Sequence, residues 1–173
     1  ESANRTESVK RVVLTSSCAS VYGDATDLLS MPNNELTEEI WNTTSSLDHQ
    51  PYSYSKVEAE KEAWKIQGEQ NRWELVTILP SFVLGPGINP HAHSESYGIV
   101  KQMGSGDFKM GTPDFNIGCV DVRDLAVAHY KAGFTSSAKG RYIISGTNSG
   151  FRELVGFVKE KYPEYPMSNR KLP

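Results

Sequence analysis

Two short apolar segments without polar alternation, residues 11–15 and residues 75–79, constrain the fold of this sequence more than any other feature. Strands that are buried on both faces of a parallel sheet read as continuous apolar runs of this kind. The segment between them begins a helical pattern at Pro51, and proline is tolerated in the first turn of a helix. Its apolar residues repeat at the period of one helical face: Tyr52, Ala59, Ala63 and Ile66. A strand, a helix and a second strand of this type predict an α/β fold with a parallel sheet covered on both faces.

The alternation of helices and strands continues further along the chain. We expect strands at residues 118–122 and 142–145 and helices at residues 97–103, 124–134 and 151–162, with Asp124 as an N-cap. Before the first helix, residues 23–50 are rich in Asn, Ser, Thr and Asp. This composition predicts a long loop, with one helical turn at residues 37–41.

The charge balance and the two cysteines exclude several classes of protein. Eighteen Lys and Arg against 21 Asp and Glu give a net charge of −3, without the basic excess of a nucleic-acid-binding protein. Two cysteines are too few for a disulfide framework or a four-cysteine zinc site. Residues 75–94 are the longest uncharged stretch, but Pro and Gly interrupt it, and residues 1–5 lead into no apolar run. We therefore expect a cytoplasmic protein that binds neither nucleic acid nor a membrane.

Open parallel sheets bind ligands at the carboxyl ends of their strands, and two such ends can be located in this sequence. The first strand is followed by a run of hydroxyls: Thr15, Ser16 and Ser17. The second strand is followed by Pro80, Ser81, Phe82 and Val83. The intervening helix carries Tyr52 and, one turn later on the same face, Lys56. We therefore expect a hydroxyl, a tyrosine and a lysine to meet in one crevice.

This set of side chains suits the transfer of a hydride to a carbonyl carbon. The carbonyl oxygen gains negative charge as the hydride arrives and needs a proton donor in place. A phenol alone is a weak acid near neutral pH, but a lysine ammonium and the positive nicotinamide ring of an oxidised cofactor both favour the phenolate. A serine hydroxyl can hold the carbonyl oxygen in line. The residues at the two strand ends therefore have the chemistry that a carbonyl reductase needs.

The spacing Tyr-x-x-x-Lys is weak evidence on its own, because it occurs twice, at Tyr52/Lys56 and at Tyr97/Lys101. Only the first pair follows a strand that ends in Thr-Ser-Ser and a long loop. For the second pair we expect an aromatic packing residue and a solvated lysine. The informative feature is therefore the order of strand, hydroxyls, tyrosine and lysine.

Five blocks of residues extend this pattern: residues 9–17 (VKRVVLTSS), residues 38–41 (EEIW), residues 52–56 (YSYSK) followed by residues 62–65 (EAWK), residues 80–86 (PSFVLGP) and residues 120–124 (VDVRD). In these blocks and their order the chain resembles the extended short-chain dehydrogenase/reductases. Within them it is similar to the dihydroflavonol reductase, cinnamoyl-CoA reductase and methylglyoxal reductase group of the NAD-dependent epimerase/dehydratase superfamily.

The resemblance implies a doubly wound parallel sheet of the Rossmann type together with a smaller α/β substrate-binding region. Residues 1–85 are expected to form the C-terminal half of the Rossmann domain, and residues 86–173 most of the substrate-binding region. Residues 118–135 are expected to return to the Rossmann sheet. Because no glycine-rich dinucleotide turn precedes the first strand, we expect the chain to be the central part of a longer enzyme, without the N-terminal half of the sheet.

Ser17, Tyr52 and Lys56 are the catalytic triad that the resemblance implies. It also implies contacts to NADP or NAD from Thr15, Ser16, Tyr52, Lys56, Pro80, Ser81, Phe82 and Val83. Ser94 and Ser96 precede or begin a predicted helix, where they either contact a cofactor phosphate or only cap the helix. The choice between NADP and NAD stays open.

Two departures from the reductase group leave alternatives open. Residues 21–24 (VYGD) are closer to the nucleotide-sugar epimerases, in which the hydroxyl role falls one position later, at Cys18 here, with Ser20 nearby. The aromatic pattern that cinnamoyl-CoA reductases carry before the lysine is absent, which disfavours an acyl-CoA substrate. The sequence favours an NAD(P)H-dependent reductase of a small aldehyde or ketone. The alternatives are a nucleotide-sugar epimerase or dehydratase and a catalytically silent Rossmann-like binding protein.

The remaining metal-ligating residue types carry less information. His91 and His93 form a His-x-His in a proline-rich loop with no third ligand near in sequence, so we predict no metal site. Cys18 and Cys119 lie in or beside apolar strands, where we expect inert core thiols. As for assembly, the expected states are a monomer or a homodimer.

Overall fold

The computed structural model describes residues 1–89 and 94–172, and it divides into two compact units. The first unit comprises Glu1–Ser81 and Arg123–Ile144, and the second comprises Phe82–Val122 and Ser145–Pro173. A three-stranded sheet forms the centre of each unit. The His-x-His of the predicted loop, His91 and His93, lies outside the described residues.

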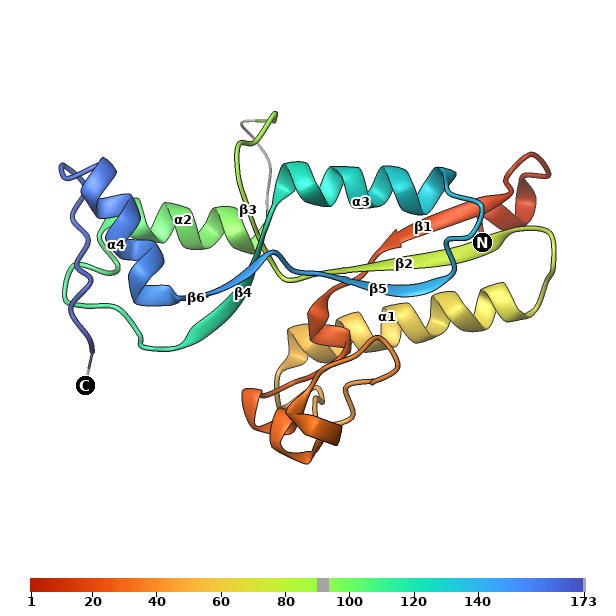
Figure 1. The fold of residues 1–173 in the computed structure, drawn as a ribbon, viewed down its shortest axis with the longest axis horizontal. Coiled ribbons are helices and arrows are strands. Elements are labelled where there is room, and N and C mark those ends of the chain that lie inside the picture. The colour runs from red at the N-terminus through yellow and green to blue at the C-terminus, as the bar shows by residue number, and fades with distance from the viewer. Residues whose placement is uncertain (90–93, 173) are drawn as a thin grey trace. The chain divides into compact units, whose positions relative to one another are not determined.

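The sheet of the first unit is parallel. Its strands are β1 (Arg11–Thr15), β2 (Glu74–Pro80) and β5 (Gly140–Ile144), in the order β1-β2-β5. Val76 of β2 is paired with Val13 on one side and with Gly140 on the other. Figure 1 shows α1 (Pro51–Gly68) on one face of these strands and α3 (Val122–Phe134) on the other. The predicted parallel sheet with two covered faces is confirmed.

The central strand β2 forms the core of this unit. Residues 75–80 are all buried, with Val76 and Leu79 fully excluded from solvent and Ile78 only 1% exposed. Burying a large aliphatic side chain of this kind is worth about 1.5–3 kcal/mol relative to leaving it in water. The continuous apolar run is therefore explained by helices that cover both sides of the strand.

The buried face of α1 differs from the predicted one. The apolar repeat predicted a face through Tyr52 and Ala59, but Tyr52 is 50% exposed and Ala59 is exposed as well. The helix instead buries Ser53, Val57 and Glu60. The prediction was wrong because it assumed an apolar contact, whereas this face is held by hydrogen bonds to the Glu60 carboxylate.

Short 3-10 turns organise much of the polar sequence of this unit. They are η1 (Ala3–Arg5), η2 (Cys18–Ser20), η3 (Ala25–Ser30) and η4 (Pro32–Asn34). The carboxylate of Asp27 fixes the start of η3, since it accepts the backbone N–H of Gly23 at 2.9 Å. At residues 37–41, where one helical turn was predicted, the structure has a single hydrogen-bonded turn, in which the Ile40 N–H donates to the Thr37 carbonyl at 3.2 Å.

The second unit has a mixed sheet. Its strands are β3 (Phe82–Leu84), β4 (Asn116–Asp121) and β6 (Thr147–Gly150), with β4 parallel to β3 and antiparallel to β6. Two helices, α2 (Glu95–Ser105) and α4 (Phe151–Lys161), supply Met103, Phe151 and Val155 of the core, and Met167 of the C-terminal segment completes it. The ring of Phe115 stacks on that of Phe151 with centroids 4.9 Å apart.

Most elements of the second half lie within a few residues of their predicted bounds, and three details differ. The strands β3 and β6 were not predicted, because three or four residues are too few to show a pattern. The helix α3 begins at Val122, so Asp124 lies inside its first turn and is not the predicted N-cap. An acidic residue in a first turn still interacts favourably with the helix dipole.

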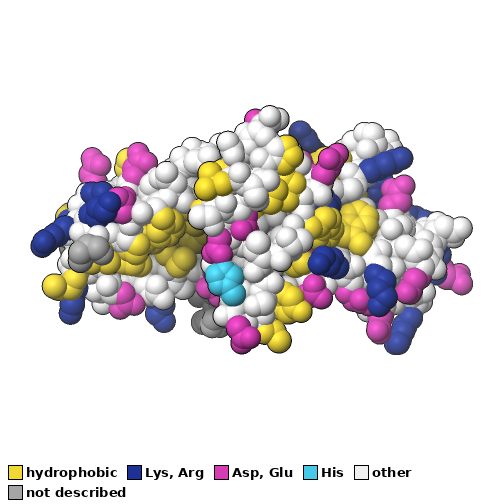
Figure 2. All heavy atoms as spheres, turned by 90° about the horizontal axis from the view of Figure 1, so that it is seen from below, with side chains coloured by type: hydrophobic (Ala, Val, Ile, Leu, Met, Phe, Trp, Pro, Cys, Tyr) yellow, Lys and Arg dark blue, Asp and Glu magenta, His cyan; other side chains and the backbone are white. Residues whose placement is uncertain are grey.

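The surface carries charges of both signs. Figure 2 shows basic and acidic side chains interspersed over the face drawn there. Within the described residues, no helix combines the length and the apolar character needed to cross a membrane.

Candidate active site

Ser17 stands where β1 gives way to η2. The ladder of the sheet continues through Ser16, whose N–H donates to the Ile78 carbonyl at 2.8 Å. Ser17 itself is extended, with φ −163° and ψ 154°, and its Oγ accepts the N–H of Ala19 at 3.1 Å as the cap of the turn. The half-buried side chain therefore lies at the carboxyl end of the strand, as the sequence predicted for a ligand-binding edge.

Tyr52 and Lys56 lie in the first two turns of α1. Pro51 occupies the first position of the helix, and Gln50 before it has a positive φ of 56°. The Lys56 Nζ lies 5.9 Å from the centroid of the Tyr52 ring. Within the described residues, no carboxylate forms an ion pair with Lys56. The turn η2 packs against α1, so the serine, the tyrosine and the lysine belong to two elements that lie side by side in Figure 1.

Thr15 and Ser16, two of the hydroxyls after β1, are committed to partners within the protein. Thr15 Oγ1 lies 2.8 Å from His129 Nε2, and His129 Nδ1 lies 2.9 Å from the Leu125 carbonyl. A carbonyl can only accept, so Nδ1 carries a proton, and in the neutral ring Nε2 accepts from Thr15. Ser16 is buried, and its Oγ donates to Glu60 Oε2 at 2.6 Å.

Among the candidates for the hydroxyl role, Ser17 differs from its two alternatives. Cys18 Sγ donates to the Leu79 carbonyl at 3.2 Å. Ser20 is fully buried, and its Oγ lies 2.8 Å from the Ser17 carbonyl and 2.6 Å from Glu60 Oε2. By contrast, no described residue accepts the hydroxyl proton of Ser17.

The residues after β2 divide between the two units. Pro80 is the buried last residue of β2, and Ser81 uses its N–H on the Ile144 carbonyl at 3.0 Å. Phe82 and Val83 belong to β3 of the second unit, where both are half-buried.

The serines predicted near the start of α2 lie in the second unit. Ser94 is the N-cap of the helix, and its Oγ accepts the N–H of Tyr97 at 3.2 Å. Ser96 is half-buried in the first turn. Among the described residues there is no group of three or more His, Cys, Asp or Glu that could hold a metal ion.

Sequence reasoning missed the most highly connected side chain of the first unit, Glu60. It is fully buried, and its carboxylate accepts hydrogen bonds from Ser16 and Ser20 at 2.6 Å, from Thr77 at 3.0 Å and from Arg141 Nε at 2.8 Å. Burial acts to raise the pKa of Glu60, but the hydrogen bonds from Arg141 and the serines outweigh it and hold that pKa below its ordinary value.

Arg141 connects this carboxylate to the loop before α1. Its Nη1 donates to the carbonyls of Glu38 and Ile40 at 2.7 and 2.6 Å, and its guanidinium lies 3.8 Å from the centroid of the Trp41 ring. The loop is also fixed from β5, since the Ile143 N–H donates to Glu38 Oε1 at 3.1 Å. The EEIW block of the sequence is therefore a docking segment for a buried arginine. A glutamate eight residues after Tyr52 and an arginine alone in a strand were the only signals.

The cysteines are protected thiols. Burial, with a further contribution from the Glu38 charge, raises the pKa of Cys18 to about 11. Burial also raises the pKa of Cys119, which is 6% exposed. These environments keep both side chains in the thiol form near neutral pH.

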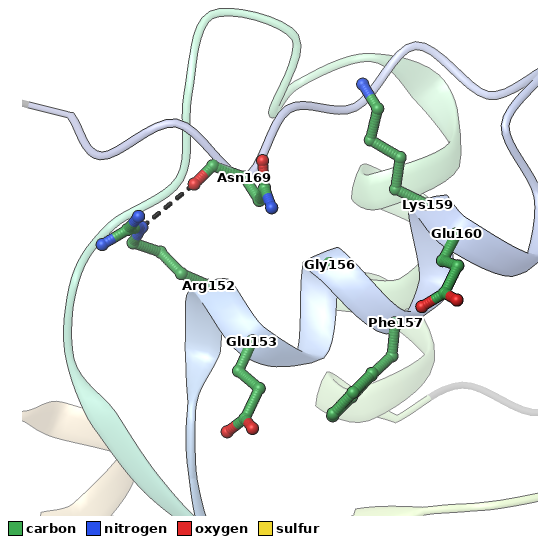
Figure 3. A pocket seen from close by; sticks show the side chains of 7 residues that line it. All are labelled: Arg152, Glu153, Gly156, Phe157, Lys159, Glu160 and Asn169. Carbon is green, nitrogen blue, oxygen red and sulfur yellow. Dashed lines mark hydrogen bonds between the residues drawn. The ribbon is translucent and has the colours of Figure 1, made fainter.

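Two surface hollows lie away from these residues. One, of about 500 Å³, lies on the outer side of α4 and is drawn in Figure 3. Its basic groups hold the C-terminal segment: Arg152 Nε donates to the Asn169 carbonyl at 3.0 Å and Lys159 Nζ to the Met167 carbonyl at 2.6 Å. The other, of about 300 Å³, is lined by residues of α3, of β5 and of the segment between them, together with Ile78 of β2.

A parallel sheet between two helix layers, with Ser17 at the carboxyl end of β1 and with α1 packed against the turn that follows it, defines an α/β protein of the Rossmann type. The profile of the NAD dependent epimerase/dehydratase family matches residues 1–144. The chain belongs to this family, and the resemblance found in its sequence blocks is confirmed.

The named relatives are reductases. The chain is 33% identical to tetraketide alpha-pyrone reductase 2 of Arabidopsis thaliana over 167 residues, 94% of this chain and 49% of that protein. It is 32% identical to cinnamoyl-CoA reductase 1 of the same plant over 164 residues, 94% and 46% of the two chains. The structure of the yeast methylglyoxal/isovaleraldehyde reductase complexed with NADPH matches with a TM-score of 0.71 and 26% identity, covering 92% of this chain and 50% of that one.

The chain thus spans about half the length of the curated relatives that it matches. The family is NAD-dependent, and solved structures similar to this chain include complexes with NADPH. The residues present fit the nicotinamide end of such a cofactor, because the Lys56 ammonium is free of carboxylate partners among the described residues and its helix α1 packs against η2, the turn after the carboxyl end of β1.

Proposed function

We propose that the protein is a reductase that uses NADPH or NADH to reduce a small aldehyde or ketone. The observation that carries the proposal is the state of three polar groups on η2 and α1. Within the described residues, the Ser17 hydroxyl proton and the Tyr52 hydroxyl have no protein acceptor, and Lys56 has no ion-pair partner. Polar groups left unused in this way at a ligand-binding edge are available to a substrate and a cofactor.

In this proposal Tyr52 is the general acid. Its hydroxyl donates a proton to the carbonyl oxygen of the substrate as negative charge develops there. Lys56 stabilises the phenolate that remains and holds a ribose hydroxyl of the cofactor by hydrogen bonds. Ser17 donates a hydrogen bond to the same carbonyl oxygen and orients it toward Tyr52. The bound nicotinamide cofactor supplies the hydride.

Hydrogen bonds within the protein limit which atoms of the other predicted cofactor-binding residues can contact the cofactor. The hydroxyls of Ser16 and Thr15 are hydrogen-bonded to Glu60 and His129, so we propose that the two residues contribute to the cofactor site through backbone atoms. We also propose backbone contacts to the cofactor from the residues at the end of β2 and the start of β3, which are Pro80, Ser81, Phe82 and Val83. Of the two serines near the start of α2, Ser94 caps the helix, and this role accounts for its observed contact. Ser96 lies within the first turn of the helix.

We further propose a division of labour along the chain. Residues 1–85 and 118–135 carry the catalytic and cofactor-binding groups, and most of residues 86–173 bind the substrate. The reductase relatives support a carbonyl substrate. A nucleotide-sugar epimerase or dehydratase is the second candidate, supported by the VYGD block at residues 21–24 and by the description of the family.

The absorbance of NADPH at 340 nm tests the proposal in the full-length protein that carries this chain. Oxidation of NADPH with a member of a panel of small aldehydes and ketones supports the reductase. Turnover of a UDP-sugar without net NADPH oxidation selects the epimerase instead. The result that contradicts both is tight cofactor binding without turnover of any carbonyl or sugar nucleotide.

A further inference from the structure

Glu60 lies in register with the two proposed catalytic side chains of α1. Tyr52, Lys56 and Glu60 are spaced by four residues, so they form a row along one side of the helix. The first two are exposed or half-buried, whereas the third is fully buried. The row therefore runs from the surface at Tyr52 into the interior at Glu60, whose carboxylate faces the sheet.

The same carboxylate holds the turn that carries Ser17. Ser16 precedes η2 and Ser20 ends it, and the Oγ atoms of both lie 2.6 Å from Glu60 Oε2. One oxygen thus fixes both ends of the five-residue segment 16–20, of which Ser17 is the second residue. Hydrogen bonds to a buried carboxylate are stronger than neutral ones and allow little positional freedom.

Arg141 fixes the carboxylate in turn. Its side chain is 7% exposed, and it donates to Glu60 Oε1 at 2.8 Å and to Ser20 Oγ at 3.2 Å. A buried ion pair of this type is weak evidence for stability, because apolar residues of similar volume often serve as well. The Glu60 carboxylate and the Arg141 guanidinium nevertheless connect four elements at one place: η2, α1, β2 and β5.

We propose that Glu60, held by Arg141, is a positioning residue that sets the place of the Ser17 hydroxyl relative to Tyr52 and Lys56. This inference rests on the proposed function, because it assigns a role for Glu60 in that same site. Glu60 acts through Ser17 and not on the substrate, since its carboxylate is fully buried. A displacement of about 1 Å in a catalytic group can cost about a hundredfold in rate, so the effect belongs in kcat.

The test is a double-mutant cycle in the full-length protein, with Ser17→Ala and Glu60→Gln made singly and together. Glu60→Gln is expected to lower kcat by about 10- to 100-fold and to leave the KM for NADPH within about twofold. In the Ser17→Ala background the same change is expected to have little further effect on kcat, because its target is already gone. Glu58→Gln is the matched control, since Glu58 is an exposed glutamate of the same helix whose one ion pair within the described residues is with Lys61.

Ser20→Ala keeps the cycle informative if Glu60→Gln does not fold. It removes the hydrogen bond of Ser20 to Glu60, together with the contact of the same hydroxyl with the Ser17 carbonyl, and leaves the ion pair of Glu60 with Arg141 in place. We expect kcat to fall by about two- to tenfold, the range of one net hydrogen bond, and this loss too is expected to vanish in the Ser17→Ala background.

Hydrogen exchange of the segment 16–21 gives a readout that needs no activity. Faster exchange there in Glu60→Gln or Ser20→Ala, and not in Glu58→Gln, supports the positioning role. Additive losses in kcat, or unchanged exchange of the segment, overturn it. If the wild-type protein reduces no carbonyl, or if Tyr52→Phe keeps full activity, the proposed function fails and the inference fails with it, whereas an active wild type with additive losses removes the inference alone.

Discussion

Lys56 Nζ lies 5.9 Å from the centroid of the Tyr52 ring, one helical turn further along α1. At this distance a cation–π contact at an exposed site contributes about 0.5–1 kcal/mol. The tyrosine also leaves half of its surface in water, although burial of an aromatic ring is among the largest stabilising contributions available to a side chain. The pair is therefore poorly explained by stability, which favours a role in binding and catalysis.

Tyr52→Phe is expected to remove most reductase turnover and to leave cofactor binding nearly intact. The hydroxyl is needed as an acid, whereas the ring only packs against Lys56, and loss of a general acid costs about 10²–10⁴-fold. Steady-state kinetics and a cofactor fluorescence titration measure the two effects separately. Tyr97→Phe is the matched control, because Tyr97 begins the other Tyr-x-x-x-Lys of the chain and is 40% exposed. Half of the wild-type activity in Tyr52→Phe is incompatible with the assignment.

Lys56→Ala is expected to damage both cofactor binding and turnover. The ammonium is proposed to hold a ribose hydroxyl and to stabilise the phenolate, so its loss raises the KM for NADPH and lowers kcat together. Lys101→Ala removes an equivalent charge from the exposed second pair and is expected to change neither constant. A Lys56 variant that loses only stability, with kinetic constants unchanged, contradicts the proposed role.

Ser17→Ala is expected to lower kcat more than Cys18→Ala or Ser20→Ala. Among the three side chains, only Ser17 has a hydroxyl proton with no acceptor in the described part of the chain. The Cys18 thiol donates to the Leu79 carbonyl, and the Ser20 hydroxyl lies against Glu60 and the Ser17 carbonyl. Kinetics of the three single variants decide the order. A larger loss at Cys18 favours the epimerase-like register of the sequence.

The sequence was sufficient to predict those strands whose residue types reflect whether they are buried or exposed. The runs at residues 11–15 (RVVLT) and 75–79 (LVTIL) lack polar alternation, as expected for a sheet with helices on both faces, so they could be located as parallel strands. The strand β6 could not, since two of its four residues, Thr147 and Asn148, are polar and exposed.

The buried face of α1 illustrates what sequence reasoning cannot supply. Glu60 is a charged residue outside the apolar repeat, so the pattern gives no reason to expect it in the core. Its partner Arg141 lies 81 residues later in the chain, and the sequence around neither residue predicts the ion pair. Tertiary contacts between charged residues far apart in sequence therefore set the orientation of the helix that carries Tyr52.

Cys18 is expected to react with iodoacetamide far more slowly than an ordinary cysteine. Its pKa of about 11 leaves about one thousandth of the thiol ionised at pH 8, and the thiolate is the reactive form. Mass spectrometry of the Cys18 peptide after timed alkylation measures the rate in the folded protein. Alkylation in urea supplies the reference, in which the thiol regains its ordinary pKa. Equal rates in the folded and unfolded protein contradict the protected environment.

Acid is expected to remove the contribution of Glu60 to the free energy of unfolding. The folded protein holds the pKa of Glu60 below the unfolded value of 4.5, so the ionised carboxylate stabilises the fold fully above about pH 4.5. As the pH falls through the lowered pKa, the folded and unfolded forms become protonated alike and the contribution is lost. At pH 7, Glu60→Gln leaves Arg141 buried without a counter-charge, and breaking a buried pair in this way costs about 3–5 kcal/mol.

Urea unfolding of the wild type and of Glu60→Gln, followed by circular dichroism between pH 7 and pH 3, measures this dependence. The difference in stability between the two proteins is expected to be largest at neutral pH and to shrink below about pH 4.5. The wild type contains other carboxyls of lowered pKa, among them Asp27 and Glu74, and the same groups are present in the variant, so their effects cancel in the difference. The double variant with Arg141→Met removes both charges and is expected to recover much of the lost stability at pH 7, because the uncompensated guanidinium is gone. A stability difference that stays constant from pH 7 to pH 3 contradicts an ionised, paired Glu60.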